Sequence, residues 1–350
     1  MSVYVLLLLM TVLLAPITSL KIKDSDKIYI FCVYTILWIF MGARGNSVGT
    51  DTAMGKYIYL VESLLPWKQI NLTYLGWSAL CKIVGLLDDE YILFQMAVSG
   101  IIVYSFARFI YYYSENIVFS TYLFVCTYTY CTAFNTMRQM CAIAVVLQAA
   151  VEILNNRKRL ALVIWAIACT IHFTAVVSLP IIWVLCKSQS VDLQRMLKKI
   201  VIIATLIVLL SEQIINLVLL IAPHYEIYIG SNLSARGRTI IVQFFYFFIL
   251  IIGWNIYRHT DNSRFKGAVI ISFISVCIGI IGANNALFIR MNAYYNVYLI
   301  CSIPDIVKRI MRNKRSIAIA NICIGLVLLV PYIIQLKGNY SNVIPYLFYN

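Results

Sequence analysis

The sequence predicts an all-α, polytopic membrane protein, and three observations support that fold class. Hydrophobic residues make up 62% of its 350 residues and charged residues only 12%, a balance that water-soluble domains do not show. Its apolar runs reach the length of about 20 residues that a helix needs to cross a membrane. Runs such as residues 3–20 and 200–215 are apolar on every side, whereas the strands of a membrane β-barrel alternate in polarity.

Charged residues divide the chain into successive apolar spans. In the first half, the spans lie near residues 2–20, 28–43, 91–113, 117–136, 139–154 and 160–186. In the second half, they lie near residues 200–222, 239–257, 268–289, 291–306 and 316–336. The stretch 160–186 is unusual because it carries His172 at its middle and Pro180 beyond it, and both residues interrupt an apolar helix.

The basic residues decide how often that stretch crosses the membrane. If it crosses twice, as a tight hairpin with His172 at its tip, 19 of the 28 Lys and Arg residues lie on the cytoplasmic side. A single crossing instead places twelve of those 19 outside. Because cytoplasmic loops carry the excess of Lys and Arg, the sequence predicts about twelve transmembrane helices, one of them split around His172. Both termini then lie outside, and residues 1–350 form a single membrane domain.

Two longer loops are predicted on the outer, periplasmic face. The main loop covers residues 44–90, and its second half, NLTYLGWSALCKIVGLL, is apolar apart from Lys82. An apolar helix interrupted in this way is typical of an interfacial or re-entrant segment. The second periplasmic loop covers residues 223–238.

Four groups of ionisable residues converge on this outer face: Arg44 with Asp51, Arg138, His172 and Arg290. Ionisable groups at membrane depth are costly, and they mark a substrate path or a paired partner. The forked donors of several Arg side chains suit phosphate or diphosphate, which favours an anionic lipid-linked substrate over a neutral solute. Two alternatives stay open. Arg44 and Arg290 lie at span ends and fit interfacial snorkelling equally well, and His172 taken alone fits a buried structural histidine.

The remaining acidic residues and the cysteines indicate no metal site and no cofactor. Asp51 also fits an N-cap for the helix that follows it, and Glu212 fits interhelical hydrogen bonding or a proton relay. Asp24 with Asp26, and the cluster at residues 88–90, fit solvated loops better than cation sites. The ten cysteines contain no CxxC pair, and the common ATP-binding and hydrolase motifs are absent. The net charge of +14 is explained by topology, so no nucleic-acid partner is expected.

Four short motifs resemble the EpsG-like branch of the Wzy-type polymerases, which assemble O-antigen and exopolysaccharide chains from lipid-linked repeat units. The motifs are ARGNSVGTDTAMGKY with Arg44, Gly49, Asp51 and Tyr57, MRQMCAIA with Arg138 and Gln139, IHFTAVVSLP with His172 and Pro180, and IRMNAYY with Arg290 and Tyr294. Their order and their predicted side of the membrane agree with the family. One departure is that NLTYLGW stands where the family often has a Glu-Pro-Gly-Tyr-like stretch.

The resemblance implies a glycosyltransferase of the bacterial inner membrane. Such an enzyme moves a growing glycan from its undecaprenyl diphosphate carrier onto a new lipid-linked repeat unit at the periplasmic face, for O-antigen in lipopolysaccharide or for exopolysaccharide. A flippase and a chain-length regulator are its expected partners beside the lipid bilayer, and no metal or cofactor is required. The implied catalytic residues are Asp51, Arg138 and His172, with Glu226 as a further candidate base, and the implied substrate-binding residues are Arg44, Tyr57, Gln139 and Arg290.

Two other functions are compatible with the same residues. A transporter or flippase for lipid-linked saccharides also uses an Arg-lined cavity, although the inverted repeats typical of transporters are not found in the sequence. A membrane O-acetyltransferase that decorates the glycan also contains a His on the outer face, so His172 alone does not distinguish it from a polymerase.

Overall fold

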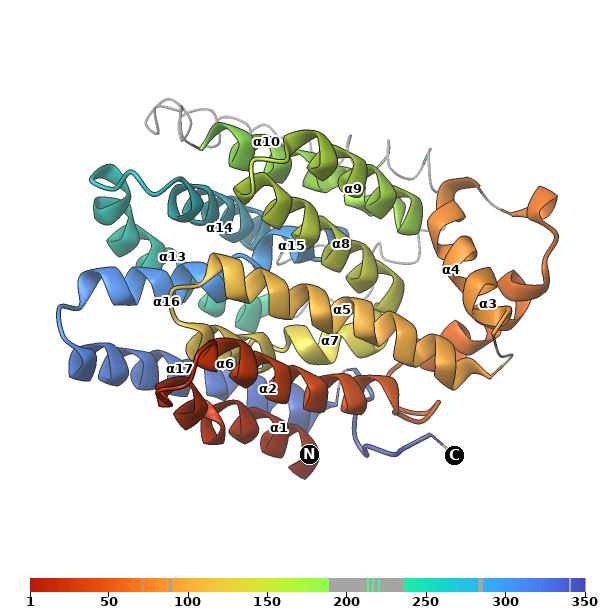
Figure 1. The fold of residues 1–350 in the computed structure, drawn as a ribbon, viewed down its shortest axis with the longest axis horizontal. Helices are drawn as coiled ribbons and strands as arrows, with labels where there is room; N and C mark the ends of the chain where they lie inside the picture. Colours follow the sequence, from red (N-terminus) through yellow and green to blue (C-terminus); the bar gives the residue numbers. More distant parts are fainter. Residues whose placement is uncertain are drawn as a thin grey trace. The chain divides into compact units, whose positions relative to one another are not determined.

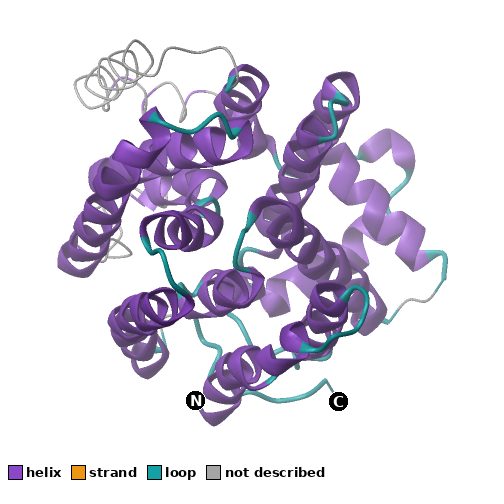
Figure 2. Cartoon of the chain, turned by 60° about the vertical axis from the view of Figure 1, so that its left-hand side comes forward, coloured by secondary structure: helices purple, strands orange, loops and turns teal. Residues whose placement is uncertain are grey.

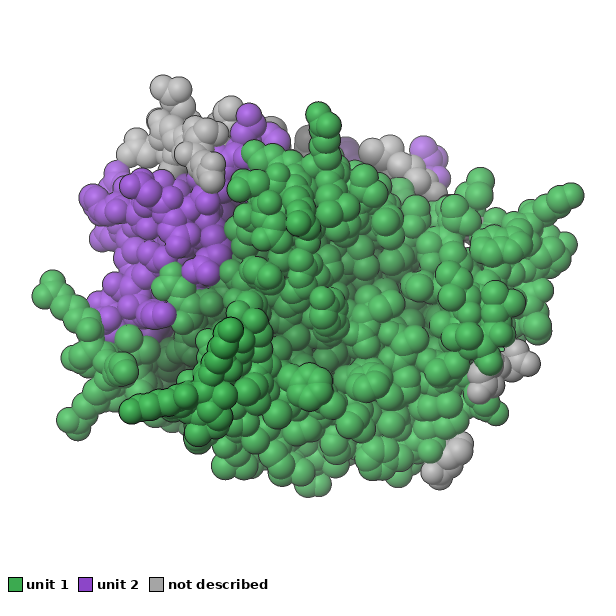
Figure 3. Space-filling view, viewed as in Figure 1, with its two compact units in different colours: residues 1–182, 312–350 green, residues 183–311 purple. Residues whose placement is uncertain are grey.

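The computed structural model describes residues 1–70, 72–87, 90–188, 236–282, 286–339 and 341–349, with isolated positions at 213, 216 and 220. Helices and loops account for these residues (Figure 2), apart from one isolated bridge between Arg44 and Phe348. The chain divides into two compact units (Figure 3). Unit 1 comprises residues 1–182 and 312–350, and unit 2 comprises residues 183–311. The predicted single membrane domain stays a prediction.

Most of the described helices belong to unit 1, and Figure 1 labels the α-helices in chain order. In chain order they are α1 (Ser2–Leu13), η1 (Ala15–Ser19), α2 (Ser25–Gly42), α3 (Thr52–Leu64), η2 (Trp67–Gln69), η3 (Leu72–Tyr74), α4 (Leu75–Gly85), α5 (Tyr91–Tyr113), α6 (Ile117–Cys126), α7 (Thr129–Asn135), α8 (Met137–Leu154), α9 (Lys158–Ile171), η4 (Phe173–Ser178) and α17 (Lys314–Gly338). The helix α10 (Leu179–Lys187) begins in unit 1. Unit 2 contains α13 (Arg236–Arg258), α14 (Ser263–Gly282), α15 (Ala286–Asn296) and α16 (Leu299–Ile310).

The described residues confirm a multi-pass membrane protein. Seven of their helical segments are long and apolar enough to span a membrane, namely Ser2–Ser19, Ser25–Gly42, Tyr91–Tyr113, Met137–Leu154, Ile240–Arg258, Ser263–Ile280 and Lys314–Gly338. An eighth span results if α6 and α7, which bend by 46° at their junction, cross together. Glu212, Glu226 and most of the expected span at 200–222 lie outside the described residues. The same holds for the predicted loop at 223–238 except its last three residues, which belong to α13. The predicted total of about twelve spans is therefore not confirmed.

Two predicted spans are not continuous helices. In the span predicted at 117–136, Tyr128 has a φ of 67°, a left-handed conformation that ends α6 and lets α7 start in a new direction. The span predicted at 291–306 consists of two shorter helices, α15 and α16. Within α16, Asp305 is buried and pairs with Arg264 of α14 at 3.7 Å.

Helix α9 ends at His172, and the chain turns there. His172 has extended backbone angles and separates α9 from η4. The indole N–H of Trp165 donates to the Ala175 carbonyl at 3.3 Å and to the Ser178 hydroxyl at 3.1 Å. In a continuous helix, the 165–175 pair would be about 15 Å apart and the 165–178 pair about 20 Å apart. The segment after His172 therefore folds back along α9, while the crossing of the membrane by each arm stays a prediction.

The two ends of the long helix α8 carry different charged residues. At its C-terminal end, Glu152 accepts from Arg108 of α5 at 2.6 Å and from Arg157 at 3.5 Å. Arg138 lies in the first turn of α8, about 20 Å away along the helix. Arg108 and Arg157 thus share one end of unit 1, as their predicted common membrane side requires, and Arg138 lies at the opposite end.

Candidate functional site

Arg138, Tyr74 and His172 form a contact cluster at the N-terminal end of α8. The guanidinium carbon of Arg138 lies 4.1 Å from the centre of the Tyr74 ring, a cation–π contact. The rings of Tyr74 and His172 follow, with centroids 6.3 Å apart. The three residues come from α8, from η3 and from the break after α9, so the fold brings together two predicted catalytic residues that are distant in sequence.

Close packing of α4 against the end of α9 places Tyr74 beside His172. A Cβ atom on Gly76 would lie 2.4 Å from the Thr170 hydroxyl and 3.1 Å from the Ile171 backbone nitrogen. A larger side chain would force Thr170 or the helix backbone to shift, so glycine at this position allows the close approach of the two helices. Figure 1 shows α3 and α4 lying together, with α4 beside the end of α9.

His172 is buried, with 7% of its surface exposed, and its orientation is fixed by Thr174. Its Nδ1 atom lies 3.3 Å from the Thr174 backbone nitrogen and 2.6 Å from the Thr174 hydroxyl. Because the backbone N–H donates to Nδ1, the neutral ring carries its proton on Nε2. The structural role expected for a buried histidine is therefore present, in contact with Tyr74.

Arg44 is fully buried, and its guanidinium bonds to backbone carbonyls of the protein. It donates to the carbonyl oxygen of Met41, and to that of Phe134 at 3.3 Å. Its own carbonyl accepts from the Gln95 amide at 2.7 Å. Burial lowers the pKa of the Arg44 guanidinium, which is consistent with the cost of placing a charge away from water. A snorkelling arginine extends its charge to water or headgroups, so the snorkelling alternative is wrong for Arg44.

Asp51 is exposed at the start of α3, on a loop that is held in place at both sides. Its carboxylate accepts from the Thr50 hydroxyl at 3.1 Å and makes no capping bond to α3. The Thr50 backbone nitrogen donates to the Asn135 side chain at 2.9 Å, and that of Gly49 donates to the Asn342 carbonyl at 2.8 Å. Gly49 has a φ of 102°, which favours glycine. The carboxylate thus lies free of the helix on a fixed loop.

The other predicted binding residues have different surroundings. Tyr57 on α3 is 65% exposed, whereas Gln139 on α8 is buried with 4% exposed. Arg290 lies on α15 in unit 2 and is described with that unit alone. The structure therefore brings together Arg138 and His172, and it gives no placement of Arg290 relative to them.

Three residues near this cluster were not predicted from the sequence: Tyr74, Glu62 and Cys81. The pKa of the Cys81 thiol is raised to about 12, chiefly by burial and also by the Glu62 carboxylate, while Arg138 acts to lower it. Glu62 and Arg138 therefore both lie within electrostatic range of Cys81. One Glu62 oxygen is buried without a hydrogen-bond partner among the described residues. A signal for Glu62 was present, because it is the one acidic residue between Thr52 and Leu87.

Comparison with known proteins gives the family. A model of the EpsG family matches residues 27–348, which is nearly the whole chain and includes every predicted site residue. The chain belongs to the EpsG family. This is a family of Wzy-like polymerases, so the resemblance seen in the sequence motifs is confirmed. The match supports a polysaccharide polymerase-like, glycosyltransferase-like role in general terms. No significant match to a curated protein sequence or to a solved structure was found.

Proposed function

We propose that this EpsG-family protein polymerises oligosaccharide repeat units carried on undecaprenyl diphosphate, at the periplasmic face of the bacterial inner membrane. The observation that carries the proposal is the Arg138–Tyr74–His172 cluster, in which a half-buried arginine and a buried histidine meet through one aromatic ring. The product is O-antigen or exopolysaccharide, and a flippase and a chain-length regulator are the expected partners.

Arg138 is suited to bind the diphosphate of the donor lipid. The Tyr74 ring covers one face of the guanidinium, while the N–H donors of an arginine lie in its plane and point outward from its edge. Two of those donors match two phosphate oxygens, and the bonds strengthen as negative charge develops on the leaving diphosphate. Arg44 is proposed to hold Arg138 in position and not to bind the diphosphate itself. Its guanidinium donates to the Phe134 carbonyl and lies 3.6 Å from the sulfur of Met137, the residue that precedes Arg138.

The acceptor sugar needs a group that takes the proton from its attacking hydroxyl. The exposed carboxylate of Asp51 is the base we propose. His172 belongs to the same cluster as Arg138, but its Nδ1 accepts from Thr174 and its Nε2 carries the proton, so we propose that the Nε2–H donates a hydrogen bond to the substrate. In the transfer, the bond between the donor sugar and its phosphate breaks, and a bond from that sugar to the acceptor oxygen forms. The proton passes to the base, and undecaprenyl diphosphate leaves. Tyr57 and Gln139 are proposed to contact the glycan or the diphosphate.

The glycan profile of a strain lacking the protein tests this function. A polymerase defect leaves glycans that carry a single repeat unit, because the unit is still made and moved across the membrane. Loss of that single unit as well would replace the proposal with a flippase or transporter. A normal chain-length ladder without acetyl groups would replace it with an O-acetyltransferase. Neither alternative has support from the family assignment.

A further inference from the structure

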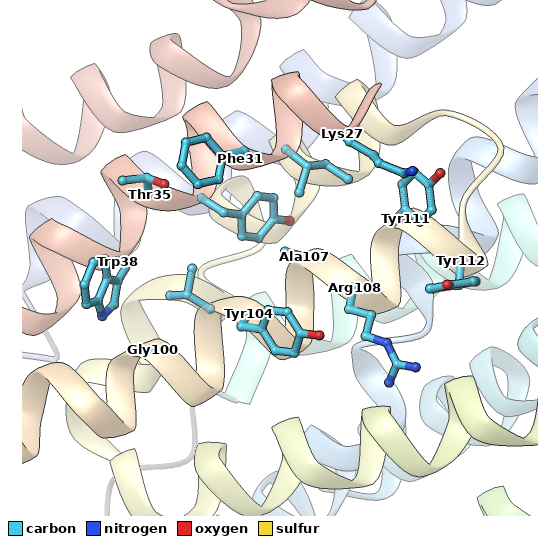
Figure 4. A pocket seen from close by; sticks show the side chains of 13 residues that line it. Lys27, Phe31, Thr35, Trp38, Gly100, Tyr104, Ala107, Arg108, Tyr111 and Tyr112 are labelled. Carbon is cyan, nitrogen blue, oxygen red and sulfur yellow. The ribbon is translucent and has the colours of Figure 1, made fainter. Parts of the chain in front are cut away.

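A groove between α2 and α5 of unit 1 has no part in the proposed reaction (Figure 4). Its volume is about 480 Å³. Aliphatic and aromatic side chains line most of its length, namely Ile30, Phe31, Tyr34, Trp38, Val103 and Tyr104. Phe31 and Tyr104 are 71% and 64% exposed, so the groove is accessible from outside the protein.

Small residues on α5 leave the space, and a hydrogen bond between the helices fixes its inner end. Gly100 and Ala107 line the groove from α5. A Cβ atom on Gly100 would lie 3.3 Å from the indole nitrogen of Trp38. That nitrogen donates to the Met96 carbonyl at 2.9 Å, which holds the Trp38 ring between the two helices. The groove is therefore a fixed feature of the α2–α5 pair.

The other end of the groove is polar and basic. Lys27 lies beside Tyr111 (Figure 4), within electrostatic range of Tyr111 and Tyr112. The guanidinium of Arg108 lies 5.6 Å from the centre of the Tyr112 ring. Lys27 pairs with Asp24 at 2.9 Å, but both side chains are largely exposed, and exposed pairs contribute little. Lys27 can therefore exchange that partner for another anion.

The charges around this end have a positive excess. Residues 21–27 carry three lysines, Lys21, Lys23 and Lys27, against Asp24 and Asp26, and Arg108 and Arg157 share the single carboxylate of Glu152. Tyrosine hydroxyls beside basic side chains are also typical of the level at which lipid headgroups lie. The groove thus combines an apolar channel with a basic, hydroxyl-bearing end.

We propose that this groove binds an anionic phospholipid, with one acyl chain along α2 and α5 and the phosphate beside Lys27, Tyr111 and Tyr112. Apolar lining fits the chain, and the excess positive charge fits the headgroup. Lys27 and Arg44 flank α2 at opposite ends, about 25 Å apart by helix rise. The lipid headgroup therefore lies at the end of unit 1 away from Arg138, and the proposal is independent of the polymerase function.

Native mass spectrometry of the purified full-length protein tests this site with phosphatidylglycerol and phosphatidylcholine as probes. The unaltered protein is expected to retain phosphatidylglycerol in preference. Lys27→Gln should weaken phosphatidylglycerol binding about fivefold, because one basic residue near an anionic headgroup contributes about 1 kcal/mol. Lys23 does not line the groove, so Lys23→Gln should leave the binding unchanged. Thr35→Trp fills the groove and should abolish binding. Ile39→Trp, one turn further along α2 and 41% exposed, is its matched control.

Three results would overturn the proposal. Equal retention of phosphatidylglycerol by all four variants would mean that the groove is not the site. Equal binding of both lipids, lost together in Thr35→Trp, would indicate an acyl groove without headgroup selection. Displacement of phosphatidylglycerol by an isoprenyl diphosphate, with the same variants affected, would assign the groove to the carrier lipid instead. Monodisperse, folded Thr35→Trp protein is required for each comparison, and Lys27→Gln gives an independent reading if that variant does not fold.

Discussion

Arg138 and Arg44 illustrate how two arginines at the same end of unit 1 have different tasks. Arg138 is half-buried and contacts the Tyr74 ring, whereas Arg44 is fully buried and bonds to backbone carbonyls. The sequence motifs predicted that both would bind substrate, because an Arg at a span end carries no local signal of its burial. Tyr74 was missed since it lies in NLTYLGW, the stretch where the family pattern departs.

Replacement of Arg138 by Lys separates donor geometry from charge. If Arg138 clamps a diphosphate with two parallel hydrogen bonds, Arg138→Lys keeps the charge and the fold but loses polymerisation by about 100-fold, because an ammonium cannot reproduce the fork. Arg138→Ala should be at least as inactive. Glycan chain length is measured at equal abundance of each variant in the membrane. Chains of near normal length from Arg138→Lys would remove Arg138 from the site.

Replacement of Arg44 should affect stability more than replacement of Arg138. Arg44→Ala leaves a cavity and unpaired buried carbonyls, with an expected cost of about 3 kcal/mol. Arg138→Ala removes a partly exposed cation–π contact worth about 1 kcal/mol. Thermal unfolding of the two purified variants, side by side, measures the difference. Equal midpoints would contradict the positioning role that the structure indicates for Arg44.

At the scale of the elements, hydropathy predicts where helices occur and says little about how they break. The predicted spans at 2–20, 28–43, 91–113 and 316–336 correspond to described helices. The bend at Tyr128 was not predicted, because a residue with left-handed backbone angles does not change the hydropathy of an apolar run. A break at His172 was predicted and is present between α9 and η4, whereas the double crossing that the placement of the basic residues predicts stays a prediction.

Substitution of Gly76 tests how helix packing holds the cluster together, because Gly76 allows the close approach of α4 to α9. In Gly76→Val, the new Cβ atom would lie only 2.4 Å from the Thr170 hydroxyl oxygen. The helices must separate, and Tyr74 should move away from His172 while the rest of unit 1 stays folded. Ala79→Val, three residues along the same helix, is the control. Shortened glycans are expected from Gly76→Val alone, and full activity would show that the approach is dispensable.

At the scale of the whole molecule, the predicted orientation places the Arg138 end outside and the Arg108 end in the cytoplasm. Ser47 and Asn155 are exposed residues at these two ends. In a background without the exposed Cys323, a maleimide that cannot cross the membrane should label Ser47→Cys in intact spheroplasts and label Asn155→Cys only after lysis. Labelling of Asn155→Cys from outside would invert the topology and move the proposed site to the cytoplasmic face.

Chain growth by the purified protein tests the central claim most directly. The protein is reconstituted in vesicles and supplied with one defined undecaprenyl diphosphate-linked repeat unit as both donor and acceptor. The account predicts lipid-linked products of two or more units from the unaltered protein, with release of undecaprenyl diphosphate, and none above background from Arg138→Lys. Absence of any lengthened product from the folded, unaltered protein, or equal growth by Arg138→Lys, would contradict the proposal that this cluster transfers the glycan.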